Sequence, residues 1–287
     1  MHFKDAKGIL SATNGTNFYR GCTHGCIYCD SRSLCYNMQH DFEDVEVKRN
    51  APELLEAALS KRREKCMVST GAMTDPYLHA EEKLLLTRRC LEVIERRGFG
   101  LAIQTKSSRC LRDLDLYKSI HQKAKCVVEM TLTTYDETLC KIVEPHVSTT
   151  RERFETLMTL KEHSIPTVVW LSPFLPFLND TEENIRGLLD CCVRAGVKGI
   201  LCFNIGMTLR DGNREYYYKM LDRHFPGLKE KYTKAYGNSY EVVSPNSPPL
   251  MALIKETCAE HGILCGVDNV FRYLHTLGPK AEQMRLF

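Results

Sequence analysis

The sequence lacks any long apolar run. No stretch of 18 apolar residues occurs in its 287 residues, so no segment is predicted to span a membrane. The first residues also lack the apolar centre of a signal peptide, and we therefore expect a cytoplasmic protein. No segment is proline- and glycine-rich or low in complexity, and apolar residues make up 43% of the chain. This composition predicts a compact globular protein.

A strong excess of charge is also missing. The formal net charge is +3, which on its own is too weak to indicate nucleic-acid binding. Basic residues alternate with tyrosines only at 214–219 and 229–240, where such a pattern could stack bases and hold phosphates. The alternative for these segments is an amphipathic helix whose tyrosines pack against the rest of the fold. A nucleic-acid substrate therefore stays open.

Cysteine, in contrast, is abundant, with 14 residues. In a cytoplasmic chain of this size they are not expected to form a disulfide framework. Most occur singly inside apolar runs, where a free cysteine behaves as a small buried hydrophobic residue. Examples are Cys66, Cys90, Cys126, Cys140 and Cys202. Only one group of cysteines is tightly spaced.

Strand and helix patterns alternate along the first two thirds of the chain. Strands are predicted at 17–20, 66–71, 100–106, 126–134, 167–171 and 197–203, and helices at 52–64, 81–97, 111–122, 152–163 and 181–195. This alternation predicts an α/β fold with a parallel sheet and helices outside it. Because no Gly-x-Gly-x-x-Gly turn follows the first strand, we favour a partial (β/α)6 TIM-like barrel over a doubly wound sheet.

The alternation stops after residue 205. Residues 206–287 read as helices and loops interrupted by several prolines, at Pro226, Pro245, Pro248 and Pro249. We therefore divide the chain into a barrel core, residues 1–205, and a C-terminal helical extension, residues 206–287, that covers the barrel mouth.

The tightly spaced group consists of Cys22, Cys26 and Cys29, three thiols within eight residues. Thiolates are the ligands of iron–sulfur clusters. Three ligands on one loop would leave one iron of a [4Fe–4S] cube open to a substrate-like ligand. The alternatives are buried thiols without a metal, or a structural zinc ion that takes His24 or Cys35 as a fourth ligand.

The spacing Cys-x3-Cys-x2-Cys, with Tyr28 before the last cysteine, resembles the signature of the radical S-adenosylmethionine (SAM) superfamily. Short motifs follow in order, and together they resemble the spore-photoproduct-lyase-like branch, often labelled "DNA repair photolyase", over about residues 1 to 205. The motifs are Thr-Asp-Pro-Tyr at 74–77, Gln-Thr-Lys-Ser at 104–107, Thr-Leu-Thr-Thr at 131–134, Glu-Pro at 144–145 and Pro-Phe-Leu-Asn-Asp at 176–180.

The resemblance implies an enzyme with two cofactors, a [4Fe–4S] cluster and SAM. The reduced cluster would cleave SAM to a 5′-deoxyadenosyl radical, which would take hydrogen from an unidentified substrate. A reductant such as flavodoxin or ferredoxin would supply the electron, and we expect a monomer with no membrane partner. The alternatives are a lyase or repair enzyme acting on nucleic acid, and a non-catalytic iron–sulfur sensor.

The resemblance also implies site residues. Cys22, Cys26 and Cys29 would bind the cluster, and the SAM contacts would be Tyr28 at the adenine, Thr74 and Asp75 at the methionine amino group, Lys106 at the carboxylate, and Thr131 and Thr133 at the ribose. Each of these residues also has an ordinary structural explanation, as a core aromatic, a turn, a strand end or a strand residue. Glu129 is a further candidate, because burying a lone carboxylate is costly.

The sequence departs from the lyase pattern in one informative place. Spore photoproduct lyase carries a cysteine hydrogen donor just before its Thr-Asp-Pro motif, where this chain has Ala72. Repair of the spore lesion is therefore not assigned. The first candidates for substrate contacts are polar residues after the sixth strand, namely Asn204, Arg210, Asp211 and Asn213.

Overall fold

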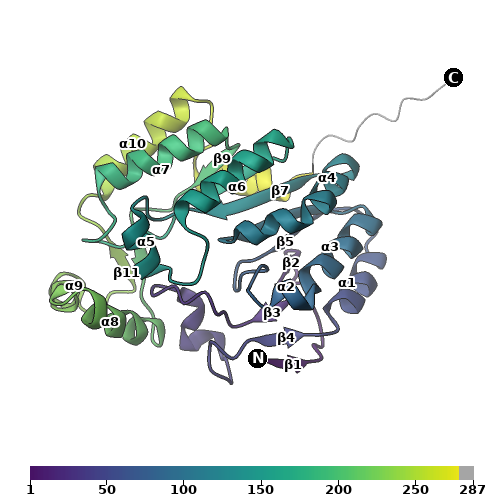
Figure 1. Ribbon diagram of the computed structural model, residues 1–287, viewed down its shortest axis with the longest axis horizontal. Helices are drawn as coiled ribbons and strands as arrows, with labels where there is room; N and C mark the ends of the chain where they lie inside the picture. The colour runs from purple at the N-terminus through teal and green to yellow at the C-terminus, as the bar shows by residue number, and fades with distance from the viewer. Residues whose placement is uncertain (278–287) are drawn as a thin grey trace.

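The computed structural model describes residues 1–277, and its centre is a sheet of six parallel strands (Figure 1). The strand order follows the sequence. In that order the strands are β2 (Gly15–Thr16), β5 (Met67–Thr70), β6 (Gly100–Thr105), β7 (Cys126–Thr131), β8 (Thr167–Trp170) and β9 (Gly199–Leu201). The predicted α/β partial barrel is confirmed.

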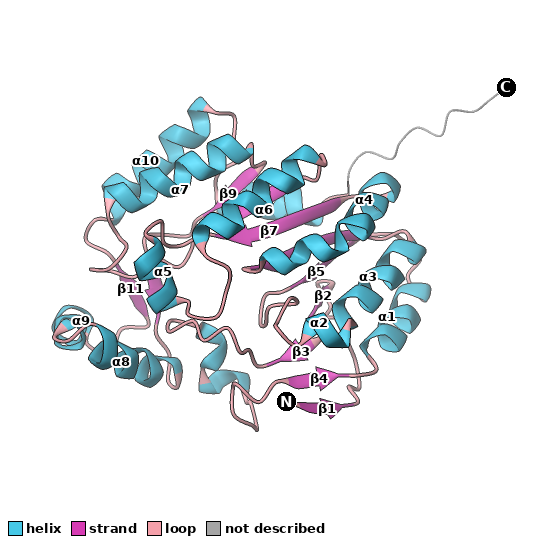
Figure 2. Ribbon diagram, in the orientation of Figure 1, coloured by secondary structure: helices cyan, strands magenta, loops and turns pink. Residues whose placement is uncertain are grey.

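The outer face of the sheet is covered by helices (Figure 2). Side chains alternate along each strand, so that Val68, Leu101, Ile103, Val128 and Val169 point to this face and join one apolar core with the helices. The helices are α1 (Ala51–Ser60), α3 (Leu86–Arg97), α4 (Leu114–Lys123), α6 (Thr150–Glu162) and α7 (Glu182–Ala195).

The inner face of the sheet has its own apolar cluster. Met67, Ala102, Val127 and Val168 point inward from the first half of their strands. The C-terminal helix α11 (Val267–His275) packs against them through residues that include Val270. Because α11 fills the interior near the amino ends of the strands, the carboxyl ends are left to form a polar site.

The first predicted strand, 17–20, is wrong in detail. Only Gly15–Thr16 joins the main sheet, paired with β5. Tyr19–Arg20 forms β3, which pairs antiparallel with β4 (Glu46–Lys48), and β4 in turn pairs with β1 (His2–Lys4). The sequence pattern missed β1 and β4, and these short strands draw Tyr19–Arg20 out of the main sheet.

The predicted helix 81–97 is broken. Leu85 adopts a left-handed conformation with φ 50°, which separates α2 (Glu81–Leu84) from α3. The Glu81 carboxylate accepts hydrogen bonds from the backbone N–H of Thr87 at 3.1 Å and of Arg88 at 3.4 Å. Glu81 therefore caps α3, and a continuous helix would lose this cap.

Other elements went unpredicted or shifted. Helix α5 (Glu137–Val143) was missed, and the helix predicted at 111–122 begins at Leu114 after a 3-10 segment, Ser108–Asp113. The region after residue 205 contains a small antiparallel pair as well as helices. Its elements are β10 (Gly206–Thr208), α8 (Asn213–His224), α9 (Leu228–Tyr236), β11 (Glu241–Val243), α10 (Ser247–Glu260) and α11.

The C-terminal elements do not lie together. Helix α10 packs on α7 (Figure 1), α11 lies under the inner face, and α8 and α9 share an apolar cluster with the cysteine loop. The division at residue 205 therefore stays a prediction. No helix within residues 1–277 is long and apolar enough to cross a membrane.

Candidate functional site

The cysteine loop and the carboxyl ends of three neighbouring strands line one cavity. Ends of parallel strands meet at one edge of the sheet, which brings together motifs that are far apart in sequence. The cavity is lined by Cys22, His24, Cys26, Cys29, Ser31, Gly71, Ala72, Met73, Thr74, Asp75, Gln104, Thr105, Lys106 and Thr131. Seven of the nine predicted site residues are in this set; Tyr28 and Thr133 are not.

The cysteine loop is held from two sides. Gly21 has φ +87°, and a Cβ on it would lie 2.5 Å from the Phe42 carbonyl oxygen. The Cys22 N–H donates to that same carbonyl at 2.9 Å. From the other side, the Thr74 hydroxyl donates to the Gly21 carbonyl at 2.6 Å. Thr74 therefore fixes the loop through its hydroxyl group.

The three thiols line the same cavity, but their sulfurs are not grouped around one shared metal position. Burial, together with the neighbouring Cys29, raises the pKa of the Cys22 thiol to about 12. Among the described residues, the Sγ atoms of these cysteines do not form a ligand set lying within 4.8 Å. A single tetrahedral zinc ion, with Zn–S near 2.3 Å, needs sulfurs about 3.8 Å apart. The three sulfurs are therefore not placed as they would be around one tetrahedral zinc ion.

Cys35, the alternative fourth ligand, lies elsewhere. Its side chain is exposed, and the Arg210 Nη1 atom contacts its sulfur at 3.3 Å. Cys35 is also absent from the cavity lining. A four-thiol zinc site that includes Cys35 is therefore not what this arrangement provides.

Asp75 joins the ends of β5 and β6. Its Oδ1 accepts from the Tyr77 N–H and from the Thr105 hydroxyl, both at 2.8 Å, and its Oδ2 accepts from the Lys106 N–H at 2.7 Å. His24 Nδ1 lies 3.6 Å from Oδ2. This buried carboxylate thus has three firm donors from the chain, and it fixes the backbone where Lys106 leaves the strand.

Lys106 lies at the edge of a buried charged network. Its Nζ is 3.9 Å from Glu144 Oε1 and 5.7 Å from the centre of the Tyr28 ring. The Glu144 carboxylate accepts hydrogen bonds from the Tyr28 hydroxyl and from Arg153 Nη2. Burial opposes ionisation of Glu144, but the charges of Arg153 and Lys106 hold its pKa below the ordinary value. Glu144 is therefore a carboxylate at neutral pH.

The network continues to strand β7. Arg153, which is fully buried, donates from Nη1 to the Thr131 carbonyl at 3.0 Å and from Nε to the Ser148 carbonyl at 2.7 Å. Thr131 turns its side chain into the cavity, where its hydroxyl lies 3.5 Å from Gln104 Nε2. Thr133 is buried away from the cavity, and its carbonyl accepts from two asparagine side chains.

Glu129 points to the inner face, beside Gln104 on the neighbouring strand. Trp170 Nε1 donates to its Oε2 at 2.5 Å. Burial raises the pKa of Glu129 to about 7, with the Trp170 hydrogen bond acting in the opposite direction. The costly buried carboxylate expected from the sequence is therefore present, between the cavity and the apolar cluster under α11.

A sequence model of the Radical SAM superfamily matches residues 16–191, which include the cysteine loop and strands β3 to β8. The chain belongs to the radical SAM superfamily. An uncharacterized protein of Mycobacterium tuberculosis is 32% identical over 228 residues, covering 77% of this chain and 66% of that protein. The chain thus spans about two thirds of this mycobacterial relative. An uncharacterized protein of Methanocaldococcus jannaschii is 30% identical over 231 residues, which cover 79% of this chain and 78% of that protein.

Solved structures with a similar fold include other radical SAM proteins. Spore photoproduct lyase complexed with dinucleoside spore photoproduct aligns with a TM-score of 0.60 and 14% identity, covering 85% of this chain and 72% of the lyase. The radical SAM methyltransferase TsrM of Kitasatospora setae, with cobalamin and a [4Fe–4S] cluster bound, aligns with a TM-score of 0.56 and 13% identity, covering 90% and 55%. At these identities the likeness is one of fold.

The radical SAM family implies a [4Fe–4S] cluster and SAM, and the cavity residues fit both groups. The cavity holds three thiols and a buried ring nitrogen, His24 Nε2, that has no hydrogen-bond partner among residues 1–277. Gly71, with φ +102°, would place a Cβ 2.1 Å from the Gln104 carbonyl oxygen, so only glycine allows the backbone to approach here. Soft donors, unpaired polar atoms and a close backbone wall suit a cluster with a polar ligand.

Several residues in and around the cavity received no role from the sequence. Gln104 and Glu144 lie in motifs that the sequence comparison singled out, but no role followed from it. Arg153 carried no signal, because it reads as one more polar residue of a helix. The proposed substrate contacts after the sixth strand do not line the cavity, and among them Arg210 is bound to Tyr240 as well as Cys35.

The tyrosine-rich segments pack inward. Tyr217 and Tyr232 are fully buried, and their hydroxyl groups are 2.9 Å apart. The Tyr216 ring lies under the Arg32 guanidinium at 3.8 Å. Tyr217 and Tyr232 thus pack inside the protein, as in the amphipathic alternative, whereas Tyr216 is half-buried and Tyr240, at the end of the second segment, is exposed.

Proposed function

We propose that this protein is an enzyme that cleaves SAM reductively and uses the resulting radical to take a hydrogen atom from a substrate. The observation that carries the proposal is the shared cavity of Cys22, Cys26 and Cys29 with the polar ends of β5, β6 and β7. When bound, the reduced cluster supplies one electron that breaks a carbon–sulfur bond of SAM, giving methionine and a 5′-deoxyadenosyl radical.

In this proposal the chain supplies ligands and position. The three cysteines would hold the cluster through three of its irons, and the fourth iron would stay open to SAM. Lys106 receives the methionine carboxylate, because its ammonium faces the cavity and its nearest carboxylate, on Glu144, is 3.9 Å away. Thr131 offers its hydroxyl to the ribose. Thr133, also assigned to the ribose from the sequence, is separated from the cavity lining.

Asp75 is proposed as a positioning residue for the SAM site. Three donors from the chain already use its oxygens, including the N–H of Lys106 itself. Its carboxylate therefore sets the direction in which the Lys106 side chain leaves β6. Tyr28 does not line the cavity itself; its ring lies 5.7 Å from Lys106 Nζ and its hydroxyl donates to Glu144, so Tyr28 is proposed to support Lys106 from outside the cavity lining. An external one-electron reductant of the flavodoxin or ferredoxin class completes the reaction.

The cavity lacks the cysteine hydrogen donor that repair of the spore lesion would use. Ala72 lines the cavity at the position where the resemblance leads one to expect a cysteine hydrogen donor. A methyl group cannot return hydrogen to a product radical. We therefore propose a reaction that does not depend on a thiol at this position.

Anaerobic reconstitution with iron and sulfide, followed by dithionite and SAM, tests the proposal. We expect methionine and 5′-deoxyadenosine in equal amounts. Cys29→Ala should abolish both, whereas Cys35→Ala, a matched change of an exposed cysteine six residues away, should leave both unchanged. An intact cluster that never cleaves SAM would instead favour the sensor alternative.

A further inference from the structure

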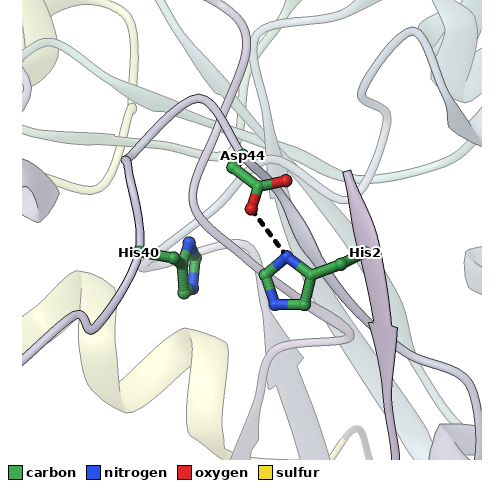
Figure 3. Close-up of side chains that lie close together, drawn as sticks. All are labelled: His2, His40 and Asp44. Atoms are coloured by element: carbon green, nitrogen blue, oxygen red, sulfur yellow. Dashed lines mark hydrogen bonds and ion pairs between the residues drawn. The ribbon is translucent and has the colours of Figure 1, made fainter.

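A second group of metal-ligating side chains lies at the N-terminal sheet. His2 of β1 faces His40 and Asp44, which come from the loop before β4 (Figure 3). One ligating atom of each residue lies within 4.8 Å of the others. Within residues 1–277 this is the one set of three histidine, cysteine or carboxylate groups that meets this spacing. None of the three residues lines the cysteine cavity.

The His40 ring makes the kind of hydrogen bond that a metal-bound histidine makes. Its Nδ1 lies 2.9 Å from the Asp41 carbonyl oxygen, and since a carbonyl only accepts, Nδ1 carries the proton. The other nitrogen, Nε2, therefore presents its lone pair. That atom is buried and has no hydrogen-bond partner in the described part of the chain. Metal-bound histidines usually donate their second ring N–H to a carbonyl or carboxylate in this way.

The remaining two ligands are already drawn together. His2 Nδ1 is 2.9 Å from Asp44 Oδ2, and the His2 and His40 ring centres are 4.8 Å apart at an angle of 81°. Glu46 Oε2, 3.9 Å from His2 Nε2, adds a second carboxylate nearby. The other Asp44 oxygen lies 2.6 Å from the Met1 amino group. Two imidazoles and a carboxylate form a nitrogen- and oxygen-rich set.

We propose that His2, His40 and Asp44 form a binding site for a divalent transition cation of the zinc class, separate from the cluster. Imidazole and carboxylate ligands suit Zn²⁺, which binds them at about 2.0 to 2.2 Å with water completing the tetrahedron. The ion takes the place of the hydrogen bond between His2 and Asp44, and a small movement of the exposed loop brings His40 Nε2 into contact.

Phe42 connects the proposed zinc site to the cysteine loop. Phe42 lies between His40 and Asp44 in the loop, and its carbonyl accepts the Cys22 N–H at 2.9 Å. An ion that ties both ends of 40–44 to strand β1 would fix this carbonyl. Zinc should therefore slow the loss of the cluster without taking part in the chemistry.

Zinc binding to the cluster-loaded full chain tests the proposal, since the cluster then occupies the three cysteines. We expect one tightly bound Zn²⁺ in competition with a chromophoric chelator. His40→Ala and Asp44→Asn should each weaken binding at least tenfold, by about 1.4 kcal/mol or more. His261→Ala, which changes an exposed histidine outside the site, should not alter the affinity. Zinc X-ray absorption should show only nitrogen and oxygen neighbours.

A thermal shift gives a readout that does not rely on the His40 and Asp44 variants. One equivalent of Zn²⁺ should raise the unfolding temperature of the wild type and of His261→Ala, because an ion that binds the folded state stabilises it. Equal zinc affinity in all variants, sulfur neighbours in the absorption spectrum, or no binding and no shift in the wild type would each overturn the site.

Discussion

The buried pair of Glu144 and Arg153 offers a quantitative test of the site. Glu144→Gln removes the negative charge and leaves the Arg153 guanidinium, which is completely buried, without its counter-ion. Breaking a buried pair by removing one partner costs about 3 to 5 kcal/mol, because an uncompensated charge stays in a low-dielectric interior. The remaining hydrogen bonds of Arg153 to two carbonyls do not neutralise that charge.

The measurement is urea unfolding of the cluster-free protein under reducing, anaerobic conditions. We expect Glu144→Gln to lower the free energy of unfolding by about 3 to 5 kcal/mol. The matched control is Glu155→Gln on the same helix as Arg153. Glu155 pairs with Arg151 at 3.1 Å, and their side chains are 60% and 80% exposed, so this change should cost less than about 0.5 kcal/mol.

The pH dependence adds a second readout. The pKa of Glu144 is lower in the folded protein than in the unfolded chain. Ionised Glu144 therefore stabilises the fold fully at a pH above its unfolded pKa, and this stabilisation is lost as the pH falls through its folded pKa. Wild-type stability should therefore fall more steeply than that of Glu144→Gln as the solution is acidified below about pH 4.5. A cost below about 1 kcal/mol, or one equal to that of Glu155→Gln, would refute the buried-pair reasoning.

Three further predictions concern the walls of the site. Burial raises the pKa of Glu129 to about 7, so the free energy of unfolding of the wild type should fall as the pH rises from about 4.5 to 7, by on the order of 3 kcal/mol. Unfolding curves of Glu129→Gln should lack this pH dependence. Thr74→Val leaves the Gly21 carbonyl without its hydroxyl donor and should cost about 1 to 3 kcal/mol and speed the decay of the cluster's visible absorbance; an unchanged decay rate would contradict the role given to Thr74. Gly71→Ala forces a Cβ against the Gln104 carbonyl, so calorimetry should show SAM affinity reduced by at least about tenfold with iron content unchanged.

Much of the fold was predictable because apolar residues are spaced differently in strands and in helices, and because strands and helices alternate regularly along the chain. Strands β5 to β9 fell where apolar runs lie between helical patterns, and the cysteine spacing alone located the loop. The short strands β1, β2 and β4 could not be found this way, since two or three residues carry no period. The break at Leu85 was hidden because Glu81 caps α3 across a turn that reads as helix.

The site was predictable only as far as its ligands follow local motifs. Asp75 and Lys106 end their strands, so both were expected at the cavity, and both line it. The hydrogen bond from the Lys106 N–H to the Asp75 carboxylate could not be predicted, because it depends on how β5 and β6 pack together. Arg153 reaches Glu144 from the following helix, and no local pattern reveals which buried acid a helix arginine will meet.

The most direct test of the three-cysteine assignment is the Mössbauer spectrum of protein reconstituted with isotopically enriched iron, recorded with and without SAM. Three cysteine ligands leave one iron of the four distinct, so SAM should change the signal of about one quarter of the iron and leave the rest unaltered. A spectrum in which SAM alters none of the iron, or in which Cys22→Ala, Cys26→Ala and Cys29→Ala retain the full cluster, would contradict the assignment.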